Sequence, residues 1–197
     1  MSTRTFYSKL NENYHSKDKI QKRVIDRGNF TYRNLIPILD NFLDRKKKVI
    51  DIGCGAGTID FYLGSKGIEV LGIDTSRNAL KIAKQSSIVI GVYKNVKFKE
   101  FNFPDGVPKG KFDAVILTEV IEHLINDNLA IKIIYNLLNK EGIIVLSTPS
   151  KNAPLYKTGL LKNFDDLVGH KRRYDLGEIV SLLKNMGFEI ILIKKTE

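Results

Sequence analysis

The sequence predicts an α/β fold in which helices flank a doubly wound, mostly parallel sheet. Short apolar runs with the length of buried strands occur at 49–52, 69–74, 96–101, 112–119 and 143–146. Segments with apolar residues at helical spacing separate most of these runs, and this alternation is typical of parallel strands joined by crossover helices. With 197 residues, of which 43% are hydrophobic, the chain suits one domain with an ordinary core.

The first predicted strand leads into a glycine-rich turn, and the stretch 47–57 is KKVIDIGCGAG. A dinucleotide-binding turn requires G-x-G-x-x-G, but Thr58 stands where the third glycine of that pattern belongs. Asp51 precedes Gly53 by two residues, where it would repel a pyrophosphate and attract a ligand that carries an ammonium and a sulfonium group. The turn therefore predicts S-adenosylmethionine as the cofactor rather than NAD.

The second predicted strand ends in an acid that complements the glycine turn. Asp74 lies 21 residues after Gly53, the spacing at which a neighbouring parallel strand brings a carboxylate to a ribose diol. Together, VIDIGCGAG and VLGIDTS resemble motif I and the following acidic motif of the class I S-adenosylmethionine-dependent methyltransferases, over about residues 47–190. The resemblance implies a Rossmann-like sheet and a cofactor site made by Asp51, Gly53, Cys54, Gly55, Gly57, Asp74, Thr75, Asn102, Phe103 and Thr118.

Asn102 departs from the pattern of that family, which usually has an acid here to bind the adenine amino group. An amide oxygen can still accept a hydrogen bond from an exocyclic amine, so we expect adenine to bind at this position.

The segment before the turn, 1–46, is predicted to be a helical N-terminal unit or lid, and 47–197 the cofactor-binding domain. From Tyr32 onward, apolar residues follow one another at helical spacing. In related methyltransferases such a segment often folds over the cofactor, so Tyr7, Tyr14 and Tyr32 are candidate lid residues. The alternative is that these tyrosines are half-buried anchors.

Capping signals mark the helices along the rest of the chain. Residues 58–65 should form the first crossover helix, with N-terminal amides facing the cofactor, and Ser76 is the predicted N-cap of the next. Gly142 is predicted to end the helix before the fifth strand. Asp175 and Glu178 predict a capping box for the last helix.

A sixth strand is predicted at 188–193, giving the order 3-2-1-4-5-6. Methyltransferases of this class usually place a seventh, antiparallel strand between the fifth and the sixth, and no segment here can supply it. We therefore expect the last strand to dock beside the fifth. The alternative is a sheet whose C-terminal edge is completed by a second copy or another partner, because an unpaired edge invites association.

Glu119, Glu122 and His123 form an E-x-x-E-H element at the end of the fourth strand. With a second histidine downstream, here His170, the element resembles that of ubiquinone-pathway O-methyltransferases and of small-RNA 3′-terminal 2′-O-methyltransferases, where it is associated with a divalent metal. These four side chains would suit Mg²⁺, Mn²⁺ or Zn²⁺. The favoured interpretation has no metal, and His123, Glu122 and His170 are the candidate catalytic residues. His123 is then either a general base or a hydrogen-bonded residue at the start of a helix.

The run GHKRRYD at 169–175 resembles methyltransferases of glycan and lipid-intermediate pathways. That resemblance makes His170, Arg172 and Arg173 candidate substrate contacts, with the arginines suited to a phosphate or carboxylate. The alternative is an exposed basic turn.

The net charge and the apolar content of the chain bear on its binding partners and its location in the cell. The formal net charge is +10, from 32 Lys and Arg against 22 Asp and Glu, which could attract RNA, an anionic lipid surface or a phosphorylated substrate. The lysines are scattered, so solvated side chains are the favoured account. No apolar segment is long enough to span a membrane and no signal peptide is visible, so we expect a cytoplasmic location. Cys54, the only cysteine, is interpreted as a small filler of the turn.

These observations predict a methyltransferase that modifies an oxygen of a small molecule, with anionic, glycan-linked and lipid-linked acceptors all open. A metal-assisted RNA 2′-O-methyltransferase and a non-catalytic cofactor-binding subunit are the alternatives. Methylation of the adenine amino group is disfavoured, because 118–121 lacks the N/D-P-P-Y/F motif of such enzymes.

Overall fold

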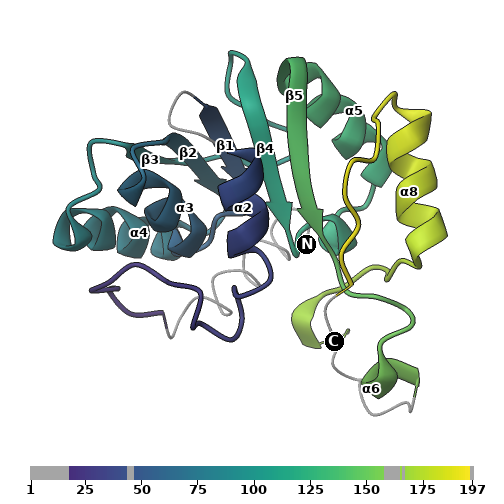
Figure 1. The fold of residues 1–197 in the computed structure, drawn as a ribbon, viewed down its shortest axis with the longest axis horizontal. Helices are drawn as coiled ribbons and strands as arrows, with labels where there is room; N and C mark the ends of the chain where they lie inside the picture. The colour runs from purple at the N-terminus through teal and green to yellow at the C-terminus, as the bar shows by residue number, and fades with distance from the viewer. Residues whose placement is uncertain (1–17, 44–46, 158–164, 166, 196–197) are drawn as a thin grey trace, which may run out of the picture.

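The computed structural model describes residues 18–43, 47–157, 165 and 167–195, and a five-stranded sheet lies at their centre (Figure 1). All neighbouring strands are parallel, and their order β3-β2-β1-β4-β5 confirms the order predicted for the first five strands. In such a sheet, ligands bind beyond the carboxyl ends of β1 and β4, where the strand order reverses. The strands are β1 (Lys48–Ile52), β2 (Glu69–Asp74), β3 (Val96–Glu100), β4 (Phe112–Thr118) and β5 (Leu138–Ser147).

Helices cover both faces of the sheet, because successive side chains of a strand point to opposite faces. Val49 of β1 belongs to one apolar core with α2, α3 and α4, whereas Ile50 and Ile52 belong to the other with α5 and α8 (Figure 1). The helices are α2 (Ile36–Phe42), α3 (Thr58–Ser65), α4 (Arg77–Ile90), α5 (Asp127–Leu137), α6 (Pro154–Lys157), α8 (Leu176–Asn185) and the 3₁₀ helix η2 (Ile121–His123). Among the described residues, no helix is both long and apolar enough to cross a membrane.

The predicted caps are confirmed. The Ser76 side chain accepts a hydrogen bond from the Ala79 amide at 3.2 Å, at the start of α4. Asp175 and Glu178 form a complete capping box at the start of α8, with both bonds at 2.9 Å. Reciprocal bonds of this kind satisfy amides that the first helical turn leaves without partners.

The segment before β1 is tied to the sheet domain by α2, which buries Ile36 and Leu39 in the core shared with β1 and α3. Tyr32 packs half-buried against the same core. The other two candidate lid residues, Tyr7 and Tyr14, lie outside the described residues, and the boundary at 46 stays a prediction.

The fifth strand is longer than predicted, and Gly142 does not end a helix. Helix α5 ends at Leu137, and β5 begins at once with Leu138 opposite Phe112. The register then shifts, so that Ile143 pairs with Ala114. The backbone at this register shift requires a glycine at position 142, because a Cβ there would lie only 2.9 Å from the Asn139 carbonyl oxygen.

The sixth strand predicted at 188–193 is not formed. The segment runs between β5 and α8 without strand pairing (Figure 1), and Ile191, Leu192 and Ile193 are 59%, 50% and 50% exposed. The predicted neighbour, β5, is present, but 188–193 makes no ladder of backbone hydrogen bonds with it. The outer edge of β5 is therefore unpaired within the part of the chain that the structure describes.

Candidate functional site

The glycine turn after β1 is shaped by backbone hydrogen bonds to the end of β2. The amides of Gly53 and Cys54 donate to the Ile73 carbonyl at 2.8 and 3.1 Å. Gly53 has a φ of 77°, and a Cβ there would lie 2.4 Å from Cγ2 of Val120. A side chain at position 53 is therefore excluded by both backbone strain and contact.

Asp74 at the end of β2 also holds the turn. Its carboxylate accepts from the Gly55 amide at 2.9 Å and from the Ser76 amide at 2.8 Å, and the residue is 8% exposed. Because a carboxylate has about four acceptor positions, these two bonds leave capacity for a ribose diol.

Gln21 joins the glycine turn to the N-terminal segment and to α4. Its side-chain amide donates to Thr58 Oγ1 at 2.9 Å and to the Ala56 carbonyl at 3.4 Å. Its backbone amide donates to Ser86 Oγ at 2.9 Å. The sequence analysis did not single out Gln21, because these contacts span 35 to 65 residues.

Asp51 is buried at the base of the turn, with 1% exposure, and its Oδ1 has no hydrogen-bond partner among the described residues. Burial, followed by the charges of Asp60 and Asp74, raises the pKa of Asp51 well above its usual value. An orphaned buried carboxyl fits a cationic ligand, so this observation agrees with a cofactor that carries an ammonium and a sulfonium.

Asp60 of α3 is a buried acid that the sequence analysis missed. It is 0% exposed and both of its carboxyl oxygens are without hydrogen-bond partners. Burial raises the pKa of Asp60 to about 7. The sequence does carry a signal for this burial, because Asp60 stands inside the apolar run TIDFYL. An acid surrounded by apolar residues in a helix is unusual unless it is buried for a reason.

A broad cleft of about 3130 Å³ lies beyond the carboxyl ends of the strands. The Asn102 side chain donates to Asp105 at 2.9 Å, so its amide oxygen is not used by that bond. Gly57, Glu122 and Arg172 are not among the residues that line the cleft. The predicted residues that line it are Asp51, Gly53, Cys54, Gly55, Asp74, Thr75, Asn102, Phe103, Thr118, Glu119, His123, His170 and Arg173.

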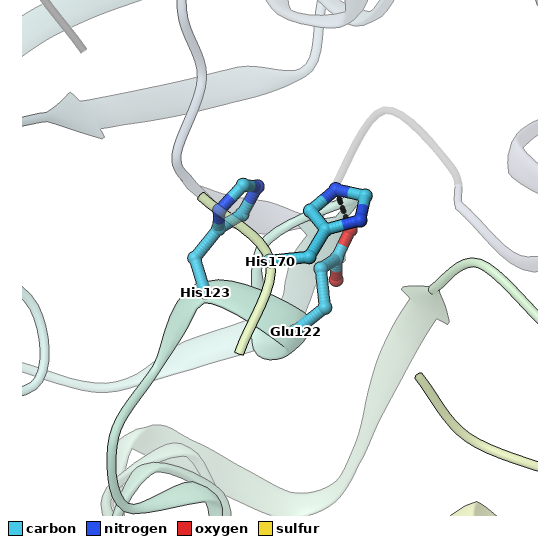
Figure 2. A group of neighbouring side chains, drawn as sticks. All are labelled: Glu122, His123 and His170. Atoms are coloured by element: carbon cyan, nitrogen blue, oxygen red, sulfur yellow. Dashed lines mark ion pairs between the residues drawn. The ribbon is translucent and has the colours of Figure 1, made fainter. Parts of the chain in front are cut away.

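Only part of the predicted E-x-x-E-H set comes together. Glu122, His123 and His170 have potential ligand atoms within 4.8 Å of one another (Figure 2). Glu119 lies apart, because its φ of 55° turns the chain between β4 and η2, and its carboxylate accepts from Ser147 Oγ at 2.7 Å. The element is therefore not a continuous helical face, and Glu119 is not part of the cluster of Glu122, His123 and His170.

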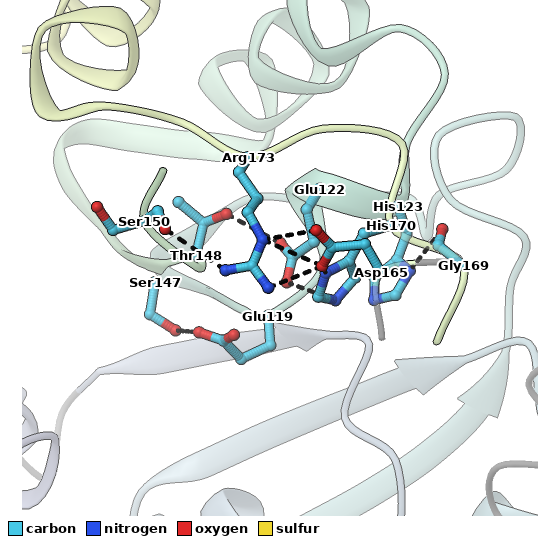
Figure 3. A network of polar contacts seen from close by, with 10 residues as sticks. All are labelled: Glu119, Glu122, His123, Ser147, Thr148, Ser150, Asp165, Gly169, His170 and Arg173. Atoms are coloured by element: carbon cyan, nitrogen blue, oxygen red, sulfur yellow. Dashed lines mark hydrogen bonds and ion pairs between the residues drawn. The ribbon is translucent and has the colours of Figure 1, made fainter. Parts of the chain in front are cut away.

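Both imidazoles of the cluster are oriented through Nδ1 (Figure 3). His123 Nδ1 lies 3.3 Å from the Gly169 carbonyl oxygen, which can only accept, so Nδ1 carries the hydrogen and Nε2 is the basic nitrogen. His170 Nδ1 lies 2.8 Å from Asp165 Oδ1, and His170 Nε2 lies 3.9 Å from Glu122 Oε1. Burial, followed by the charge of His170, lowers the pKa of His123. His123 is therefore neutral at pH 7 and able to accept a proton.

Glu122 is fully buried beneath the histidines. Its Oε2 accepts from Thr148 Oγ1 at 3.1 Å, whereas Oε1 has no hydrogen-bond partner in the described part of the chain. Burial raises the pKa of Glu122 to about 8. In the absence of a bound cation, this carboxyl holds a proton at neutral pH.

The two predicted substrate arginines are engaged within the protein. Arg172 donates to Asp127 at 2.6 Å and to the carbonyls of Leu124 and Ile125. Arg173, 7% exposed, forms a forked pair with Asp165, at 2.7 to 3.0 Å. Their role as substrate contacts stays a prediction.

Asp165 links Arg173 to His170 and was also missed by the sequence analysis. The guanidinium of Arg173, followed by the hydrogen bond from His170, lowers the pKa of Asp165, which is therefore ionised at neutral pH. No local pattern marks this aspartate, since its role follows from its contacts with His170 and Arg173.

A parallel sheet in this order, with a glycine turn after β1 and an acid at the end of β2, defines a Rossmann-like cofactor-binding domain. Residues 25–193 match the family described as Methyltransferase domain, and the chain belongs to this family. S-adenosylmethionine is the methyl donor of this class.

Curated relatives carry the name ubiquinone biosynthesis O-methyltransferase. The protein of that name from Chromobacterium violaceum is 30% identical over 125 residues, which cover 61% of this chain and 54% of that protein. The mitochondrial one from Mus musculus is 31% identical over 117 residues, covering 58% of this chain and 32% of that protein. The chain thus spans about half or less of the length of these relatives.

Solved structures share the fold. A SAM-dependent methyltransferase from Methanosarcina mazei superposes with a TM-score of 0.67 at 24% identity, covering 79% of this chain and 86% of that one. Phosphoethanolamine N-methyltransferase 2 from Haemonchus contortus, in complex with S-adenosyl-L-methionine, gives a TM-score of 0.63 at 20% identity, covering 80% of this chain and 37% of that one.

Proposed function

We propose that the protein transfers a methyl group from S-adenosylmethionine to a hydroxyl oxygen of a small molecule. The observation that carries the proposal is the cluster of Glu122, His123 and His170 beyond the carboxyl end of β4. The sulfonium donor is already activated, so the protein must mainly align the acceptor and remove its proton. The ubiquinone biosynthesis O-methyltransferases among the relatives support an oxygen acceptor.

His123 is the general base in this proposal. Its neutral ring presents Nε2, the Gly169 carbonyl fixes its orientation, and it lines the cleft. Glu122, protonated at neutral pH, cannot perform that role without first losing its proton. Asp51, Gly53, Gly55 and Asp74 hold the cofactor at the neighbouring strand ends.

A divalent metal is the second way in which the same cluster can act. Metal-binding histidines almost always hydrogen-bond through their other ring nitrogen, as His123 does to a carbonyl and His170 to Asp165. Glu122, His123 and His170 would hold the ion, which would lower the pKa of a coordinated hydroxyl. Glu122 would lose its proton on binding the ion.

The test is methyl transfer from labelled S-adenosylmethionine to phenols, catechols and aliphatic alcohols, each with and without a carboxylate or phosphate. His123→Gln should lower kcat by about 100-fold or more while the affinity for S-adenosylhomocysteine stays unchanged. Lys132→Gln, on the exposed side of α5, is the matched control. Wild-type turnover in His123→Gln would overturn the proposal.

A chelator separates the two mechanisms. If His123 acts as a base alone, activity survives EDTA and rises with pH through the pKa of this imidazole. If a metal acts, EDTA abolishes activity, Mg²⁺, Mn²⁺ or Zn²⁺ restores it, and calorimetric metal binding is lost in His123→Gln and in His170→Gln.

The same proposal includes a cytoplasmic location and a small-molecule acceptor. RNA is the alternative acceptor, supported by the net charge of +10. RNA binding that weakens steeply as salt rises would favour it, and methyl transfer to the small-molecule panel without RNA would exclude it as the sole acceptor.

A further inference from the structure

The buried carboxyls of Asp51 and Asp60 form a pair beneath the glycine turn. Asp60 reaches β1 and β2 from α3 because Gly72, the register partner of Asp51, has no side chain. A Cβ on Gly72 would lie 2.6 Å from Asp60 Oδ1 and 2.9 Å from Cys54 Sγ. No donor reaches Asp51 Oδ1 or either carboxyl oxygen of Asp60 among the described residues, and the two carboxyls interact with each other. Repulsion between two buried charges is avoided when one of the two carboxyls carries a proton and donates it to the other.

No cation compensates this pair among the described residues. The ionisable groups that face it are Asp74 from β2 and the Cys54 thiol from the turn, and the pKa of that thiol is raised by burial and by the three carboxyls. On the side of β3 the neighbour is the ring of Phe98. Removing a second proton would therefore place uncompensated negative charge in a buried site.

We propose that Asp60 is a positioning residue for the cofactor, which shares a proton with Asp51 and couples cofactor binding to release of one proton. Without the cofactor, the pair keeps two protons on the acidic side of neutrality. A cationic ligand beside Asp51 stabilises the singly protonated pair, so one O–H bond breaks and the proton leaves to solvent. Asp60 then keeps the remaining proton and donates it to the Asp51 carboxylate.

The pKa of Asp60, raised to about 7, agrees with this coupling, because the exchange then occurs within the neutral range. Only cofactor binding is involved in this coupling, so it can be tested without a methyl acceptor. A failed test would leave the proposed oxygen acceptor unaffected, and the reverse also holds.

The experiment is calorimetric titration of the full chain with S-adenosylhomocysteine, between pH 6.0 and 8.0, in buffers of different ionisation enthalpy. In the wild type, Kd should fall by at least about fivefold over this interval, and binding near pH 6.5 should release protons. Asp60→Asn removes the second acid and can donate its amide hydrogen to the Asp51 carboxylate, which lowers the pKa of Asp51. Asp51 should then already be ionised above pH 6, so the variant should show a flat profile between pH 6.0 and 8.0 and no proton release near pH 6.5.

Asp113→Asn is the matched control, because Asp113 is a carboxylate at the opposite end of the sheet, bonded to the Lys48 amide and to Asn139. It should keep the wild-type profile. The titration of the ligand itself is common to all three proteins, so the difference between them reports the pair. Equal pH profiles and equal proton release in wild type and Asp60→Asn would overturn the proposal.

Difference infrared spectroscopy of the wild type provides a second test that does not depend on the variant folding. Adding S-adenosylhomocysteine at pH 6.5 should remove intensity from the C=O stretch of a protonated carboxylic acid. An unchanged carboxylic acid band at saturation would contradict the coupling.

Discussion

Glu122 illustrates what burial does to a single carboxyl. Its folded pKa of about 8 lies above the ordinary value of 4.5, so between these values the folded protein keeps a proton that the unfolded chain releases. The free energy of unfolding therefore falls as pH rises through this interval. Below pH 4.5 both states are protonated, so the free energy of unfolding is at its highest with respect to this group and no longer changes with pH through it.

Glu122→Gln should remove that dependence, because an amide resembles the protonated acid and does not titrate. Relative to wild type, the variant should gain up to about 3 kcal/mol in unfolding free energy between pH 5.5 and 8.0. Urea denaturation in the presence of EDTA measures this difference without a metal contribution. Parallel pH curves for the two proteins would show that Glu122 does not keep its proton in the folded state.

The sequence identified the residues of the site that belong to local motifs, but not those that act through distant contacts. The glycine turn, Asp74 and His123 were recognisable because their spacing along the chain is itself the signal. Asp60 and Asp165 were not, because their roles depend on burial against β2 and on a folded loop. The spacing of the E-x-x-E-H element also placed Glu119 with Glu122. In the structure Glu119 has a positive φ, and its carboxylate accepts a hydrogen bond from Ser147 instead.

At the level of elements, α8 begins with a reciprocal cap that the sequence predicted. Asp175→Ala removes the side-chain acceptor for the Glu178 amide, and should cost about 0.5 to 2 kcal/mol of unfolding free energy. Thermal denaturation measures this loss, and Asp175→Asn, which keeps an acceptor, is the matched control. Equal losses in both variants would mean that the cap is not the cause.

Helix starts marked by capping residues were predictable, whereas the start of β5 and the state of 188–193 were not. Ser76 and Asp175 mark helix starts through bonds made within one turn. The start of β5 depends on Phe112 across the sheet, and a strand at 188–193 would depend on pairing with β5. An apolar run specifies that a segment can pair, but not that the pairing is made.

At the scale of the whole molecule, the described part of the sheet ends at β5 with an unpaired edge, and exposed apolar residues lie in the segment that follows α8. Ile191, Leu192 and Ile193 are at least half exposed. Such an edge favours association, so we expect a dimer to form with rising protein concentration. The order of the first five strands was predictable from crossover rules, but the state of this edge was not.

Leu192→Lys should weaken that association, because a charged side chain on an edge opposes strand addition. Light scattering coupled to size-exclusion chromatography should give a monomer for the variant at a concentration where the wild type is dimeric. Lys184→Gln, on α8, is the control. A wild type that stays monomeric at every concentration would contradict the expectation.

The bonds of Gln21 give the N-terminal segment a mechanical connection to the cofactor. Gln21 donates hydrogen bonds to the first turn of α3, to the glycine turn and to α4. Any displacement of the chain around residue 21 must therefore strain the loop that shapes the cofactor site. We therefore expect entry and exit of the cofactor to be coupled to movement of the chain around residue 21 through the hydrogen bonds of Gln21.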